Sequence, residues 1–276
     1  KALEIAEERN MTFVHPFNDL AVATGQGSIA MEIFKELPTV DIILVPIGGG
    51  GLAAGVSTLA KMLNPNIKVI GVEPANAACM KASLKAGKVV SLPSAVTIAD
   101  GTAVKTPGDV VFPYIQKNLD DIITVEDEEL IVNFLDVVEN HKMVVENSGL
   151  LSVAALKHLN CKDKRVVSIL SGGNMDIITM SSVVQHGLIE RGRVFTVSVQ
   201  LPDRPGELVN VANVIAQHKG NVIRLEHNQF VSINRNAAVE LKITLEAFGH
   251  EHKEQIVSAL RDKGYDPKLE NPTSLY

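Results

Sequence analysis

The sequence predicts an α/β protein with two domains: a doubly wound domain around a parallel sheet, followed by a small ferredoxin-like domain. The length of 276 residues suits two domains, at about 100–200 residues each. Short, continuous apolar runs followed by helical patterns fill the chain up to about residue 190, whereas strict alternation of apolar and polar residues begins only at residue 194. Continuous runs are typical of strands buried on both faces, and alternating runs of half-buried antiparallel strands.

The first strand–turn–helix unit contains four consecutive glycines. Residues 41–46 form a continuous apolar run, residues 48–51 are all glycine, and residues 52–63 have a helical pattern. A second apolar run at residues 67–72 completes a βαβ unit. The same order returns later, with a strand at 165–170, a turn at 171–173 and a helix at 174–185. An amphipathic helix at 126–140 lies between them. Alternating strands and helices favour a doubly wound domain, to which we assign residues 1–190.

Residues 193–276 have the order βαββαβ. Apolar residues alternate with polar ones at positions 195–201 and 239–245, as in half-buried strands. A helical pattern follows each of these strands, at about 208–215 and 251–263. This order is ferredoxin-like, and we expect it to form a separate domain.

Composition excludes several classes of protein. The net charge is −6 without a basic stripe, which argues against nucleic-acid binding. Cys79 and Cys161 have no metal-ligand spacing, and so few cysteines suggest a reducing cytoplasm. The longest apolar stretch is interrupted by glycines, and we expect no membrane span. The chain begins without Met inside a helical pattern, and we expect it to be the C-terminal part of a longer protein.

The four glycines predict a phosphate site. Without a Cβ, the backbone can approach a ligand closely, and the N–H groups at a helix start favour an anion. The alternative is a tight turn with close helix–sheet packing. The pattern is neither GxGxxG nor GxxxxGK[ST], which argues against a dinucleotide or a nucleoside triphosphate. The turn at 171–174 ends a second strand, so both turns are expected to face one crevice at the carboxyl edge of the sheet.

Five motifs carry a resemblance to a known family: GQGS at 25–28, GGGGL at 48–52, GVEP at 71–74, IADG at 98–101 and LSGGN at 170–174. In this order they resemble the fold-type-II (tryptophan synthase β-like) pyridoxal-phosphate enzymes, specifically threonine ammonia-lyases and the related serine racemases. The match covers residues 1 to about 190. The stretch DRPGEL at 203–208 resembles the effector loop of ACT domains, and an ACT domain in this place is typical of threonine ammonia-lyases.

The resemblance implies pyridoxal 5'-phosphate as cofactor and a role for several residues. Gly101 would lie against the cofactor ring, and Ser171 would hydrogen-bond the pyridine nitrogen. A serine hydroxyl does not hold that nitrogen protonated, which makes the ring a weaker electron sink and favours β-elimination over transamination. The cofactor phosphate would be held by Gly48, Gly49, Gly50, Gly51 and the amide of Leu52.

The resemblance also places the cofactor-binding lysine and the substrate-binding asparagine loop upstream of this chain. Lys61, Lys81 and Lys105 match no such motif. We therefore expect a parent lyase that converts L-threonine to 2-oxobutanoate and ammonia, with L-serine as a second substrate, and we expect this chain alone to be inactive. The alternatives are serine racemase or another β-eliminating enzyme, and a non-catalytic amino-acid sensor.

Two further sites follow from the resemblance. Glu73 and the carbonyl of Ala77 would bind a cation, although Cys79 at the third position is a poor ligand for a hard ion; the alternative is a carboxylate that caps a loop. Glu146 matches an acidic residue near the cofactor edge, where a structural hydrogen-bonding role is equally open.

The ACT-like domain implies an amino-acid effector and a homo-oligomer, either a dimer or a tetramer, because exposed edge strands favour pairing. The alternative for its loop is that residues 205–206 merely start a helix. The effector would bind at Asp203, Gly206, Glu207, Leu208 and Asn210.

Overall fold

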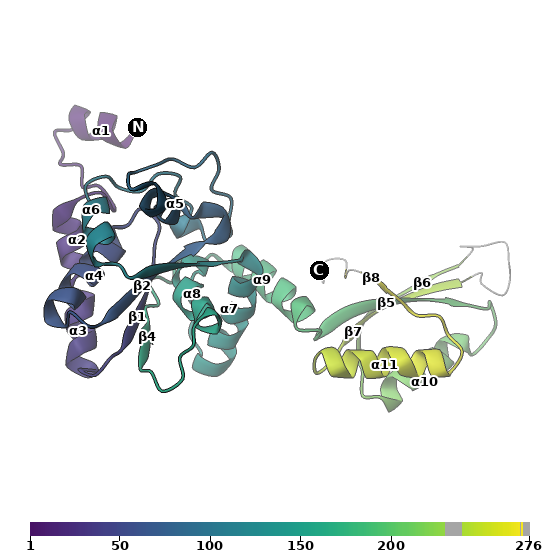
Figure 1. Ribbon diagram of the computed structural model, residues 1–276. Coiled ribbons are helices and arrows are strands. Elements are labelled where there is room, and N and C mark those ends of the chain that lie inside the picture. Colours follow the sequence, from purple (N-terminus) through teal and green to yellow (C-terminus); the bar gives the residue numbers. More distant parts are fainter. Residues whose placement is uncertain (230–238, 271, 273–276) are drawn as a thin grey trace. The chain divides into compact units, whose positions relative to one another are not determined.

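The computed structural model describes residues 1–229, 239–270 and 272. The chain divides into two compact units, Lys1–Asp176 and Ile177–Tyr276 (Figure 1). Helix α9 (Ile177–Glu190) belongs to the second unit, so the boundary lies at Asp176 and not at the predicted residue 190. Each unit has its own sheet and its own core.

The first unit is built on a four-stranded sheet in the order β3-β2-β1-β4. Every pairing is parallel, and Ile42 of β1 lies opposite Lys68 of β2 and Val166 of β4. All five residues of β1 are buried, which explains its unbroken apolar sequence. The strands are β1 (Ile42–Pro46), β2 (Lys68–Pro74), β3 (Asp121–Val125) and β4 (Val166–Ser168).

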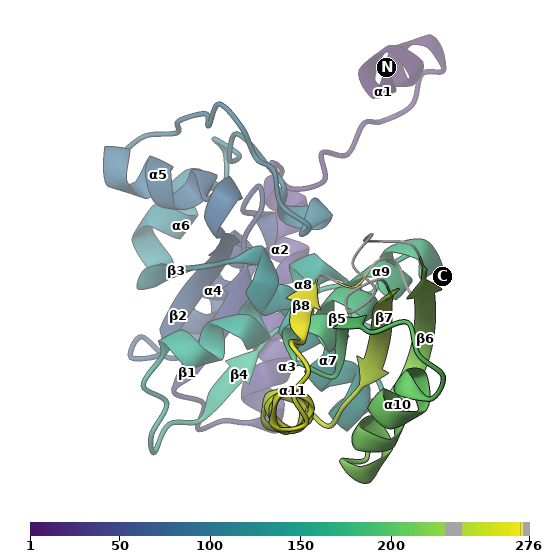
Figure 2. The same cartoon turned by 90° about the vertical axis from the view of Figure 1, so that its right-hand side faces the viewer.

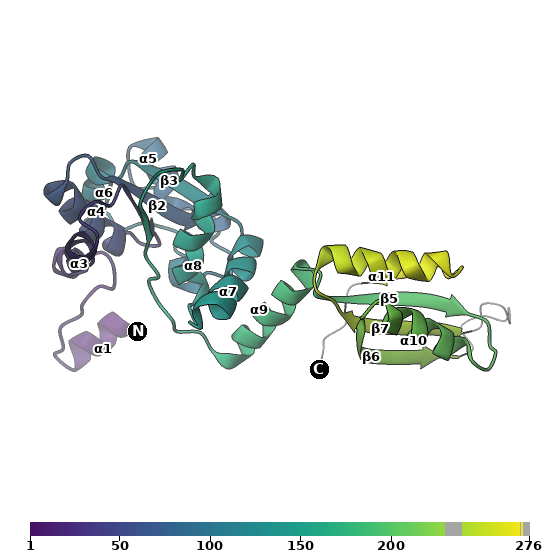
Figure 3. The ribbon, with the colours of Figure 1, turned by 90° about the horizontal axis from the view of Figure 1, so that it is seen from below.

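Helices cover both faces of this sheet, as predicted. Figure 1 shows α2, α3 and α4 on one face and α7 and α8 on the other, and Figure 3 shows α3 and α4 apart from α7 and α8 in the same way. Three short 3-10 turns, at Ala75–Ala77, Asp100–Thr102 and Ala155–His158, complete the connections. The helices are α1 (Ala2–Glu8), α2 (Leu20–Gln26), α3 (Ser28–Glu36), α4 (Gly51–Leu63), α5 (Cys79–Ala86), α6 (Phe112–Asn118), α7 (Asp127–His141) and α8 (Asn147–Ala154).

The second unit has the predicted βαββαβ order. Its sheet runs β6-β7-β5-β8 with every pairing antiparallel (Figure 2), and both α10 and α11 lie on one face (Figure 1). Apolar side chains of β5, β7 and the two helices form the core. The elements after α9 are β5 (Val194–Leu201), α10 (Glu207–Gln217), β6 (Asn221–Asn228), β7 (Val239–Glu246), α11 (His250–Asp262) and β8 (Lys268–Glu270).

Two details differ from the sequence prediction. Thr196 and Ser198 are buried although they lie on the polar face of β5, because β5 is an inner strand and its small polar side chains bond across the sheet. Thr196 Oγ1 lies 2.9 Å from Thr244 Oγ1, and Ser198 Oγ donates to Glu240 Oε1 at 3.0 Å. The helix predicted at 174–185 begins only at Ile177.

Within the described residues, no helix combines the length and the apolar character needed to cross a membrane.

Helices α2 and α4 pack closely because α4 presents small residues to its neighbours. A Cβ on Gly55 would lie 2.0 Å from the carbonyl oxygen of Ala23 in α2, whereas a Cβ on Gly25 would meet nothing within 4 Å. We expect Gly55→Ala to destabilise the protein by about 1–3 kcal/mol through overpacking, and Gly25→Ala to stabilise it by about 0.4–1 kcal/mol. Urea unfolding followed by far-UV circular dichroism measures both. Equal changes in the two variants would contradict the close α2–α4 contact.

Candidate functional site

The candidate site lies at the carboxyl edge of the parallel sheet. Leu44 of β1 pairs with Ser168 of β4, and the N–H of Ile169 donates to the Leu44 carbonyl at 3.1 Å. The two chains therefore leave the sheet side by side, one into the tetraglycine loop (residues 48–51) and the other into Ser171. Parallel pairing brings the two turns to one edge, as the sequence analysis expected.

Protein atoms pack tightly against the tetraglycine loop. A Cβ on Gly49 would lie 2.1 Å from Cδ2 of Phe17, and one on Gly51 would lie 2.7 Å from the Phe17 carbonyl oxygen. A Cβ on Gly48 would lie 3.0 Å from Cα of Thr102. Gly50 has φ +105° and precedes α4, a conformation that disfavours any side chain. Close packing, the alternative raised from the sequence, thus accounts for all four glycines.

The N–H groups of the same loop are unused. Among the described residues, none accepts a hydrogen bond from an N–H of residues 48–53. The first turn of any helix leaves such donors without partners, and here they coincide with the positive end of the 13-residue helix α4. The loop therefore has two sides: its Cα atoms contact protein, and its N–H groups remain available for an anion.

A second segment, around Phe17, packs against the tetraglycine loop, and no sequence motif indicates it. His15 Nδ1 accepts hydrogen bonds from the N–H groups of Phe17 at 3.3 Å and Asn18 at 2.9 Å. Asn18 donates to Asp109 Oδ1 at 2.7 Å and accepts from the Val110 N–H at 2.9 Å. The His15 bonds are local, whereas the two Asn18 bonds join segments about 90 residues apart and follow no local sequence pattern.

Gly101 lies between the tetraglycine loop and the start of α8. A Cβ on Gly48 would lie 3.2 Å from the Gly101 carbonyl oxygen, and a Cβ on Gly101 would lie 3.0 Å from Ser148 Oγ and 3.5 Å from Glu146 Oε1. The stretch before Gly101 is held by Asp127, which accepts from Thr97 Oγ1 at 2.5 Å and from the Ile98 N–H at 3.0 Å.

Ser171 joins this group through its neighbours. Its side chain is exposed, and its hydroxyl has no hydrogen bond to the residues that the structure describes. The Glu146 N–H donates to the Gly172 carbonyl at 3.1 Å, and the Asn174 N–H donates to Glu146 Oε2 at 3.2 Å. The structure thus brings the tetraglycine loop, Gly101 and Ser171 to one edge, with Glu146 between the last two.

Glu73 has a structural role. Its carboxylate is fully buried at the end of β2 and accepts the N–H groups of Met80 and Lys81, each at 2.8 Å, so it caps α5. Burial raises the pKa of Glu73 to about 7, although the two N–H groups oppose the shift. Burial likewise raises the pKa of the Cys79 thiol to about 12, which makes it a poor metal ligand.

The cation site proposed at Glu73 and Ala77 receives no additional side-chain ligand here. Ala77 is buried in the turn before α5. Within the described ranges, no three His, Cys, Asp or Glu side chains form a group that could hold a metal ion. Capping, the alternative raised from the sequence, describes what the Glu73 carboxylate does.

In the second unit, the predicted effector residues lie in the exposed loop between β5 and the first turn of α10. Gly206 has φ +94° and precedes α10, and a Cβ there would meet nothing within 4 Å. The Asn210 N–H donates to the Gly206 carbonyl at 3.0 Å. Asp203, Leu208 and Asn210 are exposed, and Glu207 is half-buried. Gly206 does start the helix, and the surface beside it is open.

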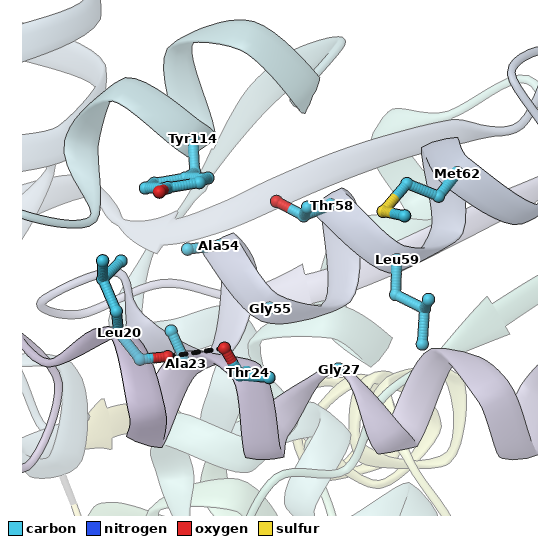
Figure 4. A pocket seen from close by; sticks show the side chains of 10 residues that line it. All are labelled: Leu20, Ala23, Thr24, Gly27, Ala54, Gly55, Thr58, Leu59, Met62 and Tyr114. Carbon is cyan, nitrogen blue, oxygen red and sulfur yellow. Dashed lines mark hydrogen bonds between the residues drawn. The ribbon is translucent and has the colours of Figure 1, made fainter.

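A separate apolar pocket of about 360 Å³ lies among α2, α4 and α6 (Figure 4). Its lining has no charged side chain and shares no residue with the carboxyl-edge site. The residues that line it are Leu20, Ala23, Thr24, Gly27, Ala54, Gly55, Thr58, Leu59, Met62 and Tyr114.

Comparison with known proteins identifies close relatives. Residues 1–172 match the family model described as "Pyridoxal-phosphate dependent enzyme". The chain is 42% identical to the L-threonine ammonia-lyase of Geobacter sulfurreducens over 96% of this chain and 66% of that protein. A structure of threonine deaminase isoform 2 from Solanum lycopersicum superposes with a TM-score of 0.63 at 35% identity, covering 67% of this chain and 55% of the other. A structure of serine racemase from Dictyostelium discoideum superposes with a TM-score of 0.58 at 36% identity, covering 63% of this chain and 57% of the other.

The chain is shorter than these relatives. It spans 67% of the length of the L-threonine ammonia-lyase of Thermotoga maritima and 51% of the length of the L-threonine dehydratase biosynthetic IlvA of Escherichia coli.

The buried Glu73 predicts a dependence of stability on pH. The pKa of Glu73 in the folded protein, about 7, exceeds the ordinary value of 4.5. Its stabilising contribution to the free energy of unfolding is therefore fully present below pH 4.5 and is lost as pH rises through 7. Between about pH 5 and about pH 8 we expect the free energy of unfolding to fall by about 1–3 kcal/mol more in the wild type than in Glu73→Gln.

Urea unfolding at the two pH values measures this difference. Glu32→Gln, at an exposed position of α3, is the matched control and should retain the pH dependence of the wild type. If Glu73→Gln retains it as well, the carboxyl does not titrate in this window.

Proposed function

Because the chain belongs to the family of pyridoxal-phosphate-dependent enzymes, we propose that it forms part of an L-threonine ammonia-lyase, which converts L-threonine to 2-oxobutanoate and ammonia. The observation that carries the proposal is the convergence of the tetraglycine loop, Gly101 and Ser171 at one sheet edge. The names of the relatives support the substrate. L-Serine, which shares the α-amino and β-hydroxyl groups, is the proposed second substrate.

The residues present fit the cofactor phosphate. An anion of this size needs several donors aimed at one point, and the unused N–H groups of Gly48–Leu52 at the start of α4 supply them. The Cα side of the loop is filled by Phe17, Thr102 and Met80, so the loop is already held in one shape before an anion arrives. A preformed site loses less entropy on binding.

Pyridoxal phosphate, when bound, supplies an electron sink for negative charge at the substrate α-carbon. Ser171 can donate one neutral hydrogen bond from its free hydroxyl. A neutral partner limits how long such charge is stabilised, which favours immediate departure of the β-hydroxyl. In this proposal, the cofactor-binding lysine is not one of the lysines of residues 1–276. Lys61, for example, is bonded to Ile67 and Asp120.

One alternative is serine racemase, and the similarity to the Dictyostelium enzyme supports it. The residues of the first unit suit both a serine racemase and an ammonia-lyase. The βαββαβ unit is typical of threonine ammonia-lyases and therefore favours the ammonia-lyase. A non-catalytic amino-acid sensor is the alternative from another class.

The second unit is proposed to be an ACT domain that binds an amino-acid effector. Its element order, its antiparallel sheet and the exposed loop at the start of α10 support this assignment. Strand β6 lies at the sheet edge and exposes Val222, Ile223 and Leu225. Exposed edge strands invite pairing with another chain, which supports a homo-oligomer. A cytoplasmic location, suggested by the cysteine usage, is part of the same proposal.

Binding of pyridoxal phosphate to the protein, followed by absorbance, tests the phosphate site. We expect inorganic phosphate to compete and Gly50→Ala to weaken binding about tenfold or more, since a side chain there would also lie 2.7 Å from Met80 Cε and Ile115 Cδ1. Gly87→Ala is the matched control, because Gly87 also has positive φ but borders open space at the end of α5. Equal losses in both variants would show strain alone and contradict the site.

The reaction is tested in the full-length protein that contains this chain. Formation of 2-oxobutanoate from L-threonine supports the ammonia-lyase. Conversion of L-serine to D-serine without an oxo acid product supports the racemase. If the protein catalyses neither reaction, the result supports the amino-acid sensor.

The effector proposal is tested by calorimetric titration of the twenty common L-amino acids. We expect at least one to bind, and Asn210→Ala to weaken that binding about tenfold. Asn213→Ala, one turn further along α10 at an exposed position, should bind as the wild type does. Equal effects of the two variants would place the effector elsewhere.

A further inference from the structure

Ser171 has little support of its own. The last backbone bond that joins its strand to β1 is donated by Ile169, two residues earlier. Helix α9 begins only at Ile177. Ser171 thus sits in an irregular stretch, exposed and without a hydrogen bond from its hydroxyl to the described residues. A hydroxyl that must meet one atom of a ligand needs its backbone fixed by something else.

Glu146 supplies two hydrogen bonds to this stretch. Its backbone N–H donates to the Gly172 carbonyl at 3.1 Å, and its carboxylate Oε2 accepts the Asn174 N–H at 3.2 Å. One bond uses the main chain and the other uses the side chain, and both fall within three residues of Ser171. Loss of the side chain would release one of the two.

The carboxylate also fills the space beside the turn. A Cβ on Gly172 would lie 2.3 Å from Glu146 Oε1 and 2.7 Å from its Cδ. The carboxyl group therefore occupies the volume that a side chain at position 172 would need. The same Oε1 lies 3.5 Å from the place of a Cβ on Gly101, so one carboxylate borders both loops of the candidate site.

Glu146 is itself firmly held. It precedes α8, and its carbonyl accepts the N–H groups of Gly149 at 2.9 Å and Leu150 at 3.2 Å. Helix α8 is fastened to the end of β4, because Ser152 Oγ donates to the Ile169 carbonyl at 2.7 Å and Ser168 Oγ donates to the Ser152 carbonyl at 3.1 Å. A rigid frame thus leads from the sheet through α8 to the turn.

We propose that Glu146 is a positioning residue for Ser171: its carboxylate, anchored at the start of α8, holds the Gly172–Asn174 turn so that the serine hydroxyl faces the candidate site. The role depends on shape and on an oxygen acceptor, and it does not require a negative charge. The part played by Ser171 toward a cofactor rests on the proposed function, whereas the control of the turn by Glu146 does not.

The first measurement is amide hydrogen exchange of residues 171–175 in the protein without cofactor. We expect Glu146→Ala to speed exchange in this turn about tenfold, because an ordered N–H loses its acceptor. Glu146→Gln keeps the volume and one acceptor oxygen and should stay within about threefold of the wild type. Glu128→Ala is the matched control: it removes an exposed glutamate from the first turn of α7 and should change nothing here.

The second measurement is a double-mutant cycle on the dissociation constant of pyridoxal phosphate, with Ser171→Ala as the second variant. Glu146→Ala should weaken binding about threefold to tenfold when Ser171 is present, the effect of about one hydrogen bond. It should weaken binding less than about twofold when Ser171 is already alanine, because a residue that acts through another shows no separate effect.

Three results would overturn the proposal. Unchanged exchange in Glu146→Ala shows that the turn is fixed by other contacts. Equal losses in Glu146→Gln and Glu146→Ala show that the charge matters. Additive losses in the cycle show that Glu146 acts independently of Ser171. If the wild type binds no pyridoxal phosphate, the proposed function fails, and the exchange measurement still decides whether Glu146 holds the turn.

Discussion

Parallel pairing of β1 with β4 is the constraint on which the candidate site depends. The two strands are far apart in sequence, yet their register sets the tetraglycine loop and Ser171 on neighbouring strand ends. Both strands belong to a parallel sheet covered by helices on each face, and because they run in the same direction they end at the same edge. The irregular loops around the site, including those of Gly101 and Glu146, are then arranged around an edge that the core already defines.

The tetraglycine loop shows how one stretch of backbone serves two surfaces. Its Cα atoms receive Phe17, Thr102, Met80 and Ile115, and its N–H groups stay without partners in the described residues. Packing from one side restrains the loop and therefore also restrains these N–H donors. Gly172 also lacks a side chain where protein atoms pack closely, because the Glu146 carboxylate occupies that space.

Much of this arrangement could be predicted from the sequence, because apolar runs and glycines are local signals. The βαβ unit at residues 41–72, the strands and helices of the βαββαβ order and the meeting of the two turns follow from local patterns, each of fewer than about 20 residues. The packing of Phe17 against the tetraglycine loop and the bonds of Asn18 to Asp109 and Val110 could not be predicted, since they join distant segments and follow no periodicity. The late start of α9 at Ile177 could not be predicted either, because no local signal in the sequence shows that residues 174–176 are irregular. Thr196 and Ser198 are polar by type but buried by position in an inner strand.

The packing of Phe17 against Gly49 and Gly51 has a consequence for how such sequences are interpreted. A Cβ at either position would collide with protein atoms whether or not a ligand is bound. A descendant that had lost its chemistry would therefore still be selected to keep these glycines in order to fold. The glycine motif records the architecture of the loop, and its N–H groups record its use. An inactive descendant and a working enzyme would share the glycine motif. They would differ in whether an anion is bound by the N–H groups of the loop.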